Sequence, residues 1–291
     1  MGILRMRMNL EAAFKAVRKF LVQHVASRAN SRRTLKKRHQ GQARWKWSAE
    51  TVVWFYTMSA DTVTFDSVKA VILSAHEETT TEEKVNFYNS WAHSYEQDVA
   101  VLDYLAPGLA ANMISTHVTG DRGAMSVLDV ACGTGLAAKL MKNDGFGQFV
   151  GVDGSEAMLE RARQSGLYLD LKQSLLGDQP LPFQMDSFDV VVISGALSTG
   201  QVPVTVVRHL CKCAKPGGYI CMTTRSNHCN QEYKSTLELE LRKMEDERLW
   251  SRVEVMEVEK WERAVLEQDD EEYIPVSRFL SDVSRYRYIH S

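Results

Sequence analysis

The segment from Val127 to Gly135 constrains the fold more than any other part of the chain. It reads VLDVACGTG, an apolar run followed by two glycines one residue apart. The apolar run predicts a short buried strand. The glycines predict a tight turn, because glycine adopts backbone angles that are costly for other residues. Residues 136–142 then suit a helix. A strand that enters a helix through a glycine turn is typical of α/β proteins.

The strand–helix order repeats along the rest of the chain. We expect further strands at 148–152, 168–175, 188–193 and 219–224, with weaker strand signals at 252–258 and 271–274. The most apolar and β-branched of these, 188–193, predicts a central strand. Strands that alternate with helices form a mostly parallel sheet covered on both faces. The sequence therefore predicts an α/β, doubly wound fold.

Two helices are expected before the first strand. The pattern T-x-x-E at 80–83 has the form of a helix capping box. In the helix that would follow, Tyr88, Trp91 and Tyr95 share one face. Such an aromatic stripe suits the protein core as well as a lid over a ligand. A second helix, at about 97–114, should break near its central proline.

Charge is distributed unevenly along the chain. The net charge is −2, but residues 1–47 hold 13 Lys and Arg and a single acid, so they carry +12 and the remainder −14. We interpret residues 1–75 as a basic, poorly ordered extension with one amphipathic helix near 9–29, because such runs are usually solvated. A targeting presequence and a nucleic-acid or nuclear-import segment are the alternatives. The domain itself is expected over 80–275, followed by a tail at 276–291.

Composition narrows the class further. Hydrophobic residues make up 44% and charged residues 25%, as in globular proteins, and no run approaches the roughly 20 apolar residues of a membrane-spanning helix. The five cysteines are odd in number and follow no secretory signal, so we expect reduced thiols in an intracellular compartment. Cys211 and Cys213 lie closer together than a usual zinc-ligand pair, which favours buried structural side chains and no metal site.

The glycine turn and one acidic residue predict a nucleoside-containing ligand. The helix after Gly135 offers free N–H groups and a positive dipole end at the turn. Asp153 follows the second strand, 18 residues beyond Gly135. In a doubly wound sheet this position suits a carboxylate that binds both ribose hydroxyls.

A dinucleotide-dependent oxidoreductase is the competing hypothesis. The spacing Gly133-x-Gly135-x-x-Ala138 also satisfies the loose dinucleotide fingerprint. An NAD(P)-dependent short-chain enzyme would need a Tyr-x-x-x-Lys pair on a helix far downstream. Tyr168 and Lys172 have that spacing, but they lie in a strand-like segment. A partner protein that lacks catalysis is a third hypothesis.

Four motifs, in order and spacing, resemble the class I S-adenosylmethionine-dependent methyltransferases. They are LDVACGTG at 128–135, GVDGSxxM at 151–158, LPF leading into SFDVV at 181–191, and KPGG at 215–218. The stretches 88–100 and 195–203 further resemble a family of methyltransferase-like proteins encoded in the Williams–Beuren syndrome chromosome region. The resemblance implies a Rossmann-like, seven-stranded, mostly parallel sheet preceded by N-terminal helices, with S-adenosyl-L-methionine as cofactor and S-adenosyl-L-homocysteine as product.

The resemblance also implies roles for individual residues. Those that would contact the cofactor are Tyr88, Trp91, Tyr95, Asp129, Ala131, Cys132, Gly133, Gly135, Asp153, Gly154, Ser155, Met158, Leu176, Gly177, Asp178, Ser194 and Gly195. Asp129, Ala131 and the two glycines would lie against the methionine part, and Asp153 against the ribose. Ser194 and Gly195 would face the methyl donor, and the aromatic trio would form a lid. No catalytic residue is assigned, because a general base is optional when the donor is already activated.

The sequence indicates only the chemical class of the methyl acceptor. No Asn/Asp-Pro-Pro-aromatic motif follows the 188–193 strand, which argues against methylation of adenine or glutamine nitrogen and leaves a small molecule or a protein side chain. We do not expect nucleic acid as a partner, since the domain is net negative, and we expect no membrane association. A cytoplasmic location, with the nucleus as a further site, is expected; mitochondrial import is the lesser alternative.

Overall fold

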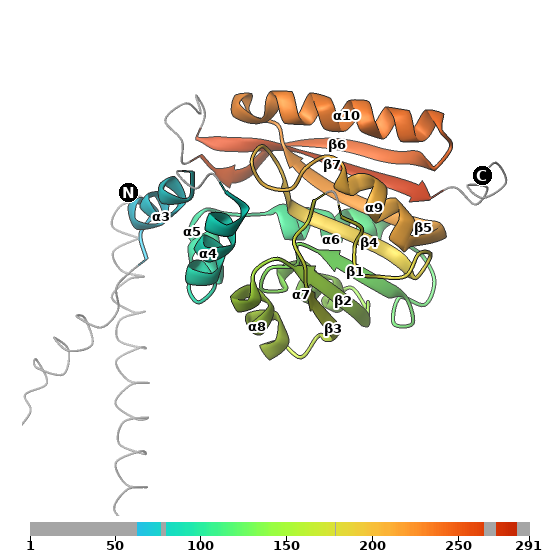
Figure 1. Cartoon of the computed structure of the whole chain (residues 1–291), viewed down its shortest axis with the longest axis horizontal. Helices are drawn as coiled ribbons and strands as arrows, with labels where there is room; N and C mark the ends of the chain where they lie inside the picture. The colour runs from blue at the N-terminus through green and yellow to red at the C-terminus, as the bar shows by residue number, and fades with distance from the viewer. Residues whose placement is uncertain (1–62, 77–79, 178, 265–271, 284–291) are drawn as a thin grey trace, which may run out of the picture. The chain divides into compact units, whose positions relative to one another are not determined.

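The computed structural model describes residues 63–76, 80–177, 179–264 and 272–283 (Figure 1). All of them belong to one unit of contacting chain, residues 62–291. The predicted helix at 9–29 and Asp178 lie outside the described residues. Within the described ranges no single helix has the length and apolar content needed to cross a membrane; only α5 and α6 together, across an 86° bend, reach them.

Four helices precede the first strand in the described part of the chain: α3 (Phe65–His76), α4 (Thr81–Trp91), α5 (Tyr95–Val101) and α6 (Ala106–His117). The predicted capping box is confirmed, because the Thr80 hydroxyl accepts the Glu83 N–H at 3.2 Å and the Glu83 carboxylate accepts the Thr80 N–H at 2.8 Å. The predicted second helix is divided into α5 and α6. Pro107 lies in the first turn of α6, where a missing N–H costs nothing, so the break precedes the proline.

The sheet has seven strands, in the order β3-β2-β1-β4-β5-β7-β6. They are β1 (Ser126–Val130), β2 (Gln148–Asp153), β3 (Tyr168–Gln173), β4 (Phe188–Leu197), β5 (Ala214–Arg225), β6 (Trp250–Arg263) and β7 (Tyr273–Val283). The first five pair in parallel, and β7 runs antiparallel between β5 and β6. The predicted Rossmann-like, mostly parallel sheet is confirmed.

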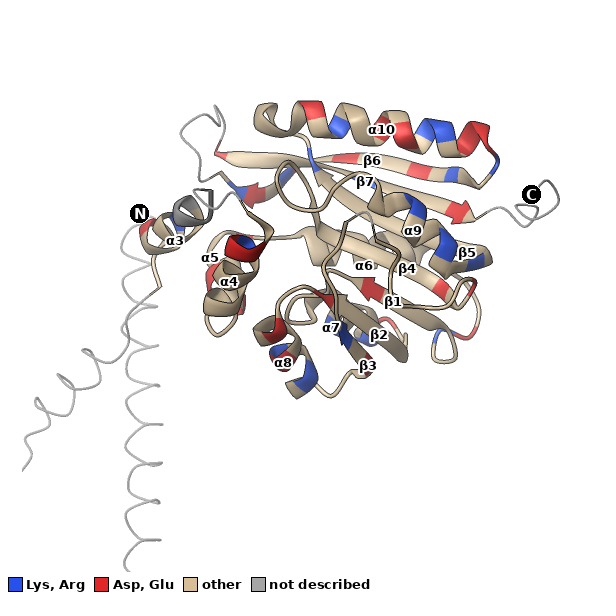
Figure 2. Ribbon diagram, in the orientation of Figure 1, with Lys and Arg blue, Asp and Glu red and all other residues tan. Residues whose placement is uncertain are grey.

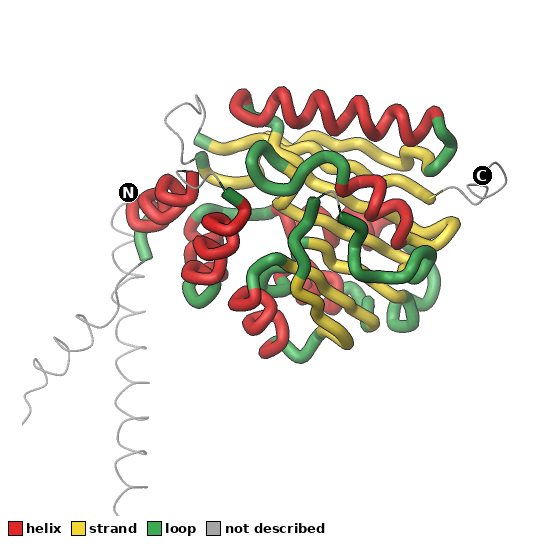
Figure 3. The backbone as a smooth tube through the Cα atoms, in the orientation of Figure 1, coloured by secondary structure: helices red, strands yellow, loops and turns green. Residues whose placement is uncertain are grey.

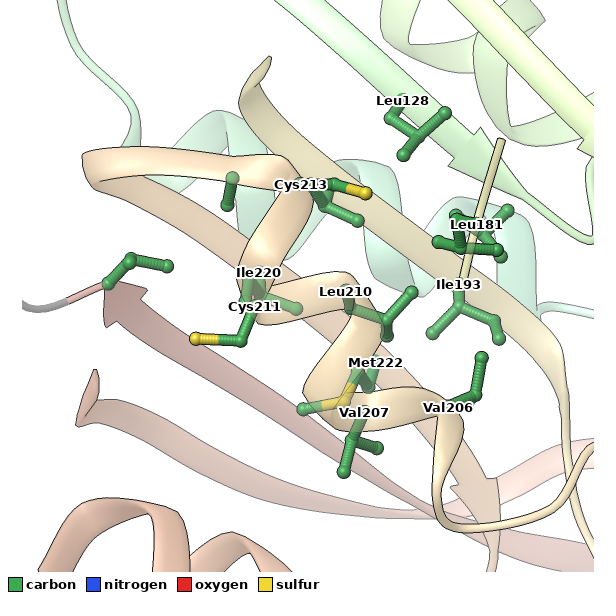
Figure 4. Close-up of a cluster of buried hydrophobic side chains, with 14 of the residues drawn as sticks. Leu128, Leu181, Ile193, Val206, Val207, Leu210, Cys211, Cys213, Ile220 and Met222 are labelled. Carbon is green, nitrogen blue, oxygen red and sulfur yellow. The ribbon is translucent and has the colours of Figure 1, made fainter. Parts of the chain in front are cut away.

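Successive residues of the central strands face opposite sides of the sheet and build two cores. Val190 and Val192 pack with α6 and α7 (Leu136–Asn143). Val191 and Ile193 pack with α9 (Val206–Cys213) and, further along the sheet, α10 (Gln231–Asp246). Figure 4 shows the second core, in which the predicted structural cysteines, Cys211 and Cys213, lie among Leu, Ile and Val side chains.

The remaining helices follow the sheet's edges. Helix α8 (Glu156–Gln164) contacts β2 and β3. A short 3₁₀ turn, η1 (His228–Asn230), leads into α10, whose outer side carries both acidic and basic residues (Figure 2). Arg208 of α9 donates to Glu247, just past α10, at 2.6 and 2.9 Å. These ion pairs join α9 to the end of α10.

The end of the domain differs from the prediction. We expected a tail from residue 276, since the sequence around 274–277 lacks apolar alternation. Strand β7 instead continues to Val283, with residues such as Ser277 and Leu280 buried in succession. A strand flanked on both edges and covered on both faces needs no alternation, which is why the pattern was misleading.

The beginning of the domain also differs from the prediction. Helix α3 falls within the segment assigned to the extension, yet Val68 is 1% exposed and packs on Leu102, which is fully buried. Phe65 and Ile72 lie beside this contact. The domain therefore begins before residue 80, with α3 held against α5 through a small apolar cluster.

Gly218, in the turn before the apolar stretch of β5, provides a test of how closely the backbone packs there. A Cβ on Gly218 would lie 2.9, 3.0 and 3.1 Å from the carbonyl oxygens of Asp189, Lys215 and Phe188. Backbone atoms cannot move aside cheaply, so Gly218→Ala should lower the free energy of unfolding by about 1–3 kcal/mol. Urea denaturation measures this.

Gly108→Ala is the matched control for that substitution. Its Cβ would meet only a Leu140 methyl, at 3.9 Å, inside helix α6. Because alanine is the better helix former, this variant should gain up to about 1 kcal/mol. Equal effects of the two substitutions on the free energy of unfolding would show that the close backbone approach at Gly218 does not contribute to stability.

Candidate active site

The carboxyl ends of β1, β2 and β4 meet at one edge of the sheet, where loops follow each strand (Figure 3). The loop after β1 contains three residues with left-handed backbone: Ala131 (φ 54°), Gly133 (φ 55°) and Gly135 (φ 94°). A Cβ on Gly133 would meet nothing within 4 Å, whereas one on Gly135 would press on the Tyr168 ring at 3.0 Å. Gly133 thus borders open space and Gly135 serves packing.

A pocket of about 330 Å³ lies at this edge, which we call the main pocket. It is lined by Thr81, Lys84, Val85, Tyr88, Tyr95, Tyr104, Ala131, Gly133, Asp153, Gly154, Ser155, Met158, Leu175, Leu176, Gly177, Ser194, Gly195, Ala196, Gln201, Val202 and Pro203. Its volume falls within the range of about 300–1,000 Å³ that is usual for small-molecule sites. The topological position is the one where doubly wound sheets bind ligands.

A side cavity of about 40 Å³ shares part of the main pocket's lining. The residues that only the side cavity contacts are Pro107, Asp129, Cys132, Thr134, Leu136 and Ala137. Thr134 Oγ1 and Ser194 Oγ both line it, both are buried, and neither has a hydrogen-bond partner among the described residues. Buried hydroxyls without partners are costly, so these two are suited to polar groups of a ligand.

Asp153 ends β2 and lines the main pocket. One carboxylate oxygen accepts the Gly133 N–H at 2.8 Å, and the other accepts the Ser155 N–H at 2.9 Å. Burial raises the pKa of Asp153, and the backbone N–H donors of Ser155, Gly133 and Gly154 oppose that rise. Each carboxylate oxygen can accept more than one hydrogen bond, so Asp153 retains capacity for ligand hydroxyls.

Asp129 lies at the base of the side cavity, 2% exposed. Its carboxylate accepts the Tyr168 hydroxyl at 2.7 Å. Burial raises the pKa of Asp129 to about 7; the hydrogen bond from Tyr168 lowers it, the charge of Asp153 raises it and a backbone N–H at Ala138 lowers it. Near neutral pH, Asp129 is therefore divided between its neutral and its charged form.

Helix α4 bridges the two sides of the main pocket. On one side the Asn89 side-chain oxygen accepts the Ser155 hydroxyl at 2.7 Å and the Ala157 N–H at 3.2 Å. On the other, Tyr88 donates to the Gln201 side chain at 3.3 Å, and Lys84 donates to the Gly200 carbonyl. The helix thus forms a roof fastened at both edges.

The aromatic stripe is divided between roof and core. Tyr88 and Tyr95 line the main pocket as predicted. The prediction for Trp91 is wrong: this side chain is 9% exposed, lines neither cavity and donates to Asp98 at 2.6 Å. Its ring instead packs between the two tyrosines, 6.2 Å from Tyr88 and 4.9 Å from Tyr95.

Most of the other predicted residues gather around the two cavities. Those that line them are Asp129, Ala131, Cys132, Gly133, Asp153, Gly154, Ser155, Met158, Leu176, Gly177, Ser194 and Gly195. Gly135 lines neither, because the Tyr168 ring covers it. Asp178 lies outside the described residues. That these side chains bind the cofactor stays a prediction.

Sequence reasoning missed several lining residues. Tyr104 follows α5 in a turn, and its hydroxyl packs so closely on Gly195 that a Cβ there would overlap it. No local pattern marks such a residue, since its role depends on the distant β4. By contrast, Gln201, Val202 and Pro203 belong to the 195–203 motif, so that motif contained a usable signal.

The Tyr168 and Lys172 pair lacks the arrangement that an oxidoreductase would need. Both lie on strand β3 rather than on a helix. The Tyr168 hydroxyl is held by Asp129, whereas Lys172 donates to the Pro182 carbonyl at 2.9 Å and lies over the Phe183 ring. The two side chains serve separate packing contacts.

Several known proteins similar to this chain are named as methyltransferases. The profile of a family described as "Methyltransferase domain" matches residues 121–274. Human Methyltransferase-like protein 27 is 45% identical over 183 residues, which cover 63% of this chain and 74% of that protein. A demethylmenaquinone methyltransferase of Lactococcus lactis is 32% identical over 165 residues, or 54% of this chain and 65% of that protein. A solved TehB-like methyltransferase from Corynebacterium glutamicum has 15% identity and a TM-score of 0.46, covering 66% of this chain and 96% of that chain.

Fold and site together define an α/β protein with a pocket at the carboxyl ends of its parallel strands, the place where doubly wound sheets bind ligands. The chain belongs to the methyltransferase-domain family, as a class I S-adenosylmethionine-dependent methyltransferase. Its cofactor is S-adenosylmethionine, and the predicted resemblance is confirmed. The residues fit this cofactor, because the open side of Gly133 and the two unpartnered hydroxyls provide space and polar partners for it.

The raised pKa of Asp129 generates a prediction about stability. The carboxyl ionises near pH 7 in the folded protein but near 3.8 without burial. Between these two pH values, unfolding releases a proton from Asp129. The free energy of unfolding therefore falls as pH rises, by up to about 4 kcal/mol. Asp129→Asn removes this effect. The stability difference, variant minus wild type, should therefore grow from about pH 4 to pH 7 and then stay level.

Urea denaturation across that pH range measures the difference. Tyr168→Phe is the companion variant: it removes a hydrogen bond that lowers the pKa of Asp129, so the same window should extend to higher pH. A pH-independent difference between wild type and Asp129→Asn would contradict the burial of an ionisable carboxyl at this position.

Proposed function

We propose that the main pocket and the side cavity together bind S-adenosylmethionine in one orientation. Asp129, Ala131, Gly133 and Thr134 contact its methionine part in and beside the side cavity. Support comes from the unpartnered Thr134 hydroxyl and the N-terminus of α7 at this place, which suit a carboxylate. The carboxylate of Asp129 suits an ammonium group.

Asp153 accepts the ribose hydroxyls in this proposal. The observation that carries it is the position of its carboxylate at the end of β2, inside the main pocket and fixed by Gly133 and Ser155. The adenine lies against apolar side chains such as those of Met158 and Leu176, and Gly154 completes this wall of the main pocket.

The protein contributes alignment and exclusion of water to the reaction. The cofactor supplies a methyl group already activated by the positive charge on its sulfur. Burial raises the pKa of Tyr88 to about 12 and also raises the pKa values of Tyr95 and Tyr104. These three hydroxyls are therefore neutral donors and acceptors around the reacting centre, suited to orienting an acceptor rather than to removing its proton.

A small molecule is the acceptor class that this site suits best. The roof helix α4 is fastened on both sides of the main pocket, which leaves little room for a polypeptide segment. The similarity to a demethylmenaquinone methyltransferase, a protein named for a small-molecule acceptor, adds support. We retain a protein side chain as the less favoured acceptor.

We also propose that neither nucleic acid nor a membrane is a partner, and that the protein acts in the cytoplasm, with the nucleus as a second location. Residues 48–291 are net negative, which opposes phosphate binding. All five cysteines are free, which suits a reducing compartment. The basic segment 1–47 is the part of the chain that could change these proposals.

Isothermal titration with S-adenosylmethionine tests the assigned orientation. Asp153→Ala should weaken binding at least tenfold, about 1.4 kcal/mol, because two hydroxyls lose a charged acceptor. Asp170→Ala is the matched control, since Asp170 is a half-exposed carboxylate on the neighbouring β3, and it should bind normally. Binding that survives Asp153→Ala would refute the ribose assignment; NADH binding instead would restore the oxidoreductase hypothesis.

The absence of nucleic acid among the partners has its own test. Removing residues 1–61, which precede the contacting unit 62–291, should leave RNA binding weak and unchanged at about 150 mM salt, because the remaining domain repels phosphate. Fluorescence anisotropy with a labelled single-stranded RNA measures it. Tight, salt-sensitive binding by the full chain that disappears on truncation would show that the basic segment recruits RNA.

A further inference from the structure

Five residues line both the main pocket and the side cavity, and we call this shared wall the neck. They are Tyr95, Tyr104, Ala131, Gly133 and Ser194. The side cavity has a volume of about 40 Å³, little more than the roughly 30 Å³ that one water molecule occupies in the liquid, so the groups around it lie close together. In the proposed function the methionine part of the cofactor lies in and beside the side cavity and the nucleoside in the main pocket. The sulfur between them then lies at the neck.

The Tyr104 hydroxyl is held near the end of β4. It occupies the place that a side chain on Gly195 would take, since a Cβ there would overlap it. Gly195 is fixed in turn, because its N–H donates to the Thr223 hydroxyl of β5 at 2.8 Å. The Trp261 ring packs against the Tyr104 ring, with 5.8 Å between their centres. The Tyr104 hydroxyl therefore lies against the residue that follows Ser194.

The hydroxyls of the neck make no hydrogen bonds within the described part of the chain. Ser194 Oγ is buried there without a partner, and the hydroxyls of Tyr95 and Tyr104 donate to no described residue. Burial raises the pKa of Tyr95, and Tyr104 adds to the rise, as expected for two hydroxyls that lie near each other. Hydroxyls without partners are costly in a buried wall, so these groups are suited to hydrogen bonding with a ligand.

Among the described residues, no side chain of the neck can take up a proton from the acceptor near neutral pH. The charged residues that line the two cavities are Lys84, Asp129 and Asp153. Both carboxylates are assigned to the cofactor, where one binds the ammonium group and the other the ribose. The Lys84 ammonium, which donates to the Gly200 carbonyl, adds a positive charge to the wall of the main pocket. The acceptor side therefore offers neutral hydroxyls and one cation, but no general base.

We propose that the methyl acceptor presents an oxyanion, the ionised oxygen of a phenol or an enol, to which the Tyr104 and Ser194 hydroxyls donate hydrogen bonds. This inference rests on the proposed function, because it assigns the acceptor of the same pocket. An oxyanion can accept from both hydroxyls and still direct a lone pair at the methyl carbon. The new O–C bond forms as the S–C bond breaks, and the electron pair of that bond stays on sulfur. The negative and positive charges cancel, and no proton has to leave.

Nitrogen and sulfur acceptors suit the neck less well. A neutral amine becomes a cation when it is methylated, and this cation must lose a proton that the hydroxyls cannot hold. The Lys84 charge in the same wall would also repel it. A thiolate needs no base, but sulfur is a weak hydrogen-bond acceptor, so the two hydroxyls would gain little from it. Fixed hydroxyl donors favour a negatively charged oxygen over both.

Absorbance titration of the full-length protein saturated with S-adenosylhomocysteine tests the proposal. The probes share a nitro-substituted ring and differ in the reacting atom: 4-nitrophenol and 4-nitro-1-naphthol, each with its amine and thiol counterparts. Their absorbance reports both binding and ionisation. We expect at least one hydroxyl probe to bind about tenfold more tightly than its amine and its thiol. The pH at which that probe is half ionised should fall by about 1 on binding, because the site favours the anion.

Substitution of the two donors separates hydrogen bonding from the shape of the wall. Tyr104→Phe and Ser194→Ala should each weaken binding of the hydroxyl probe about tenfold and return its half-ionisation toward the pH of the free probe. Binding of the amine probe and of S-adenosylhomocysteine should not change. Tyr219→Phe is the matched control, because Tyr219 of β5 is partly buried and lines neither cavity. If both variants bind and ionise the probe as wild type does, the hydroxyl assignment is overturned.

The outcomes also separate this inference from the proposed function. If the wild-type protein binds S-adenosylhomocysteine but neither hydroxyl probe, or binds an amine or a thiol more tightly, the acceptor proposal fails and the cofactor site stands. If S-adenosylhomocysteine itself does not bind, the proposed function fails, and the acceptor proposal fails with it.

Discussion

The hydrogen bond from the Gly133 N–H to the Asp153 carboxylate holds the site together. It joins the loop after β1 to the end of β2 at 2.8 Å, so that the left-handed turn and the acidic side chain keep a fixed relation. The second carboxylate oxygen receives Ser155, whose hydroxyl in turn donates to Asn89 of the roof helix. A single buried carboxylate thus couples the floor, one wall and the roof of the pocket, and its charge is tolerated because three backbone N–H groups face it.

Patterns confined to neighbouring residues predicted the fold well. The strand, glycine turn and helix at 127–142, the capping box at Thr80 and the parallel order of the first five strands all follow from local periodicity or turn chemistry. The continuation of β7 beyond residue 275 did not follow, because its two covered faces remove the alternation that marks a half-buried strand. Helix α3 was missed for a related reason: its contact with Leu102 joins segments whose pairing no short pattern records.

The site shows the same division between local and distant determinants. Ala131, Gly133 and Asp153 were found because each belongs to a motif whose spacing reflects one turn of structure. Trp91 was misassigned, because a helical stripe of aromatics does not reveal which member turns inward to a polar partner such as Asp98. Tyr104 reaches the pocket from the segment between α5 and α6, and only the assembled sheet places it against Gly195 of β4. Ala131 adds a small cost, since a non-glycine residue with positive φ is strained.

The fastening of α4 has a kinetic consequence. With Asn89 bound to one pocket edge and Lys84 and Tyr88 to the other, neither cofactor nor product can pass through the roof while both sets of contacts hold. Exit through the roof would need an opening step in which several hydrogen bonds break and re-form, and such steps set the pace of many enzymes. By that route S-adenosylhomocysteine would escape slowly. The protein would then be sensitive to the cellular ratio of spent to charged methyl donor, and that ratio would govern its flux even at saturating acceptor.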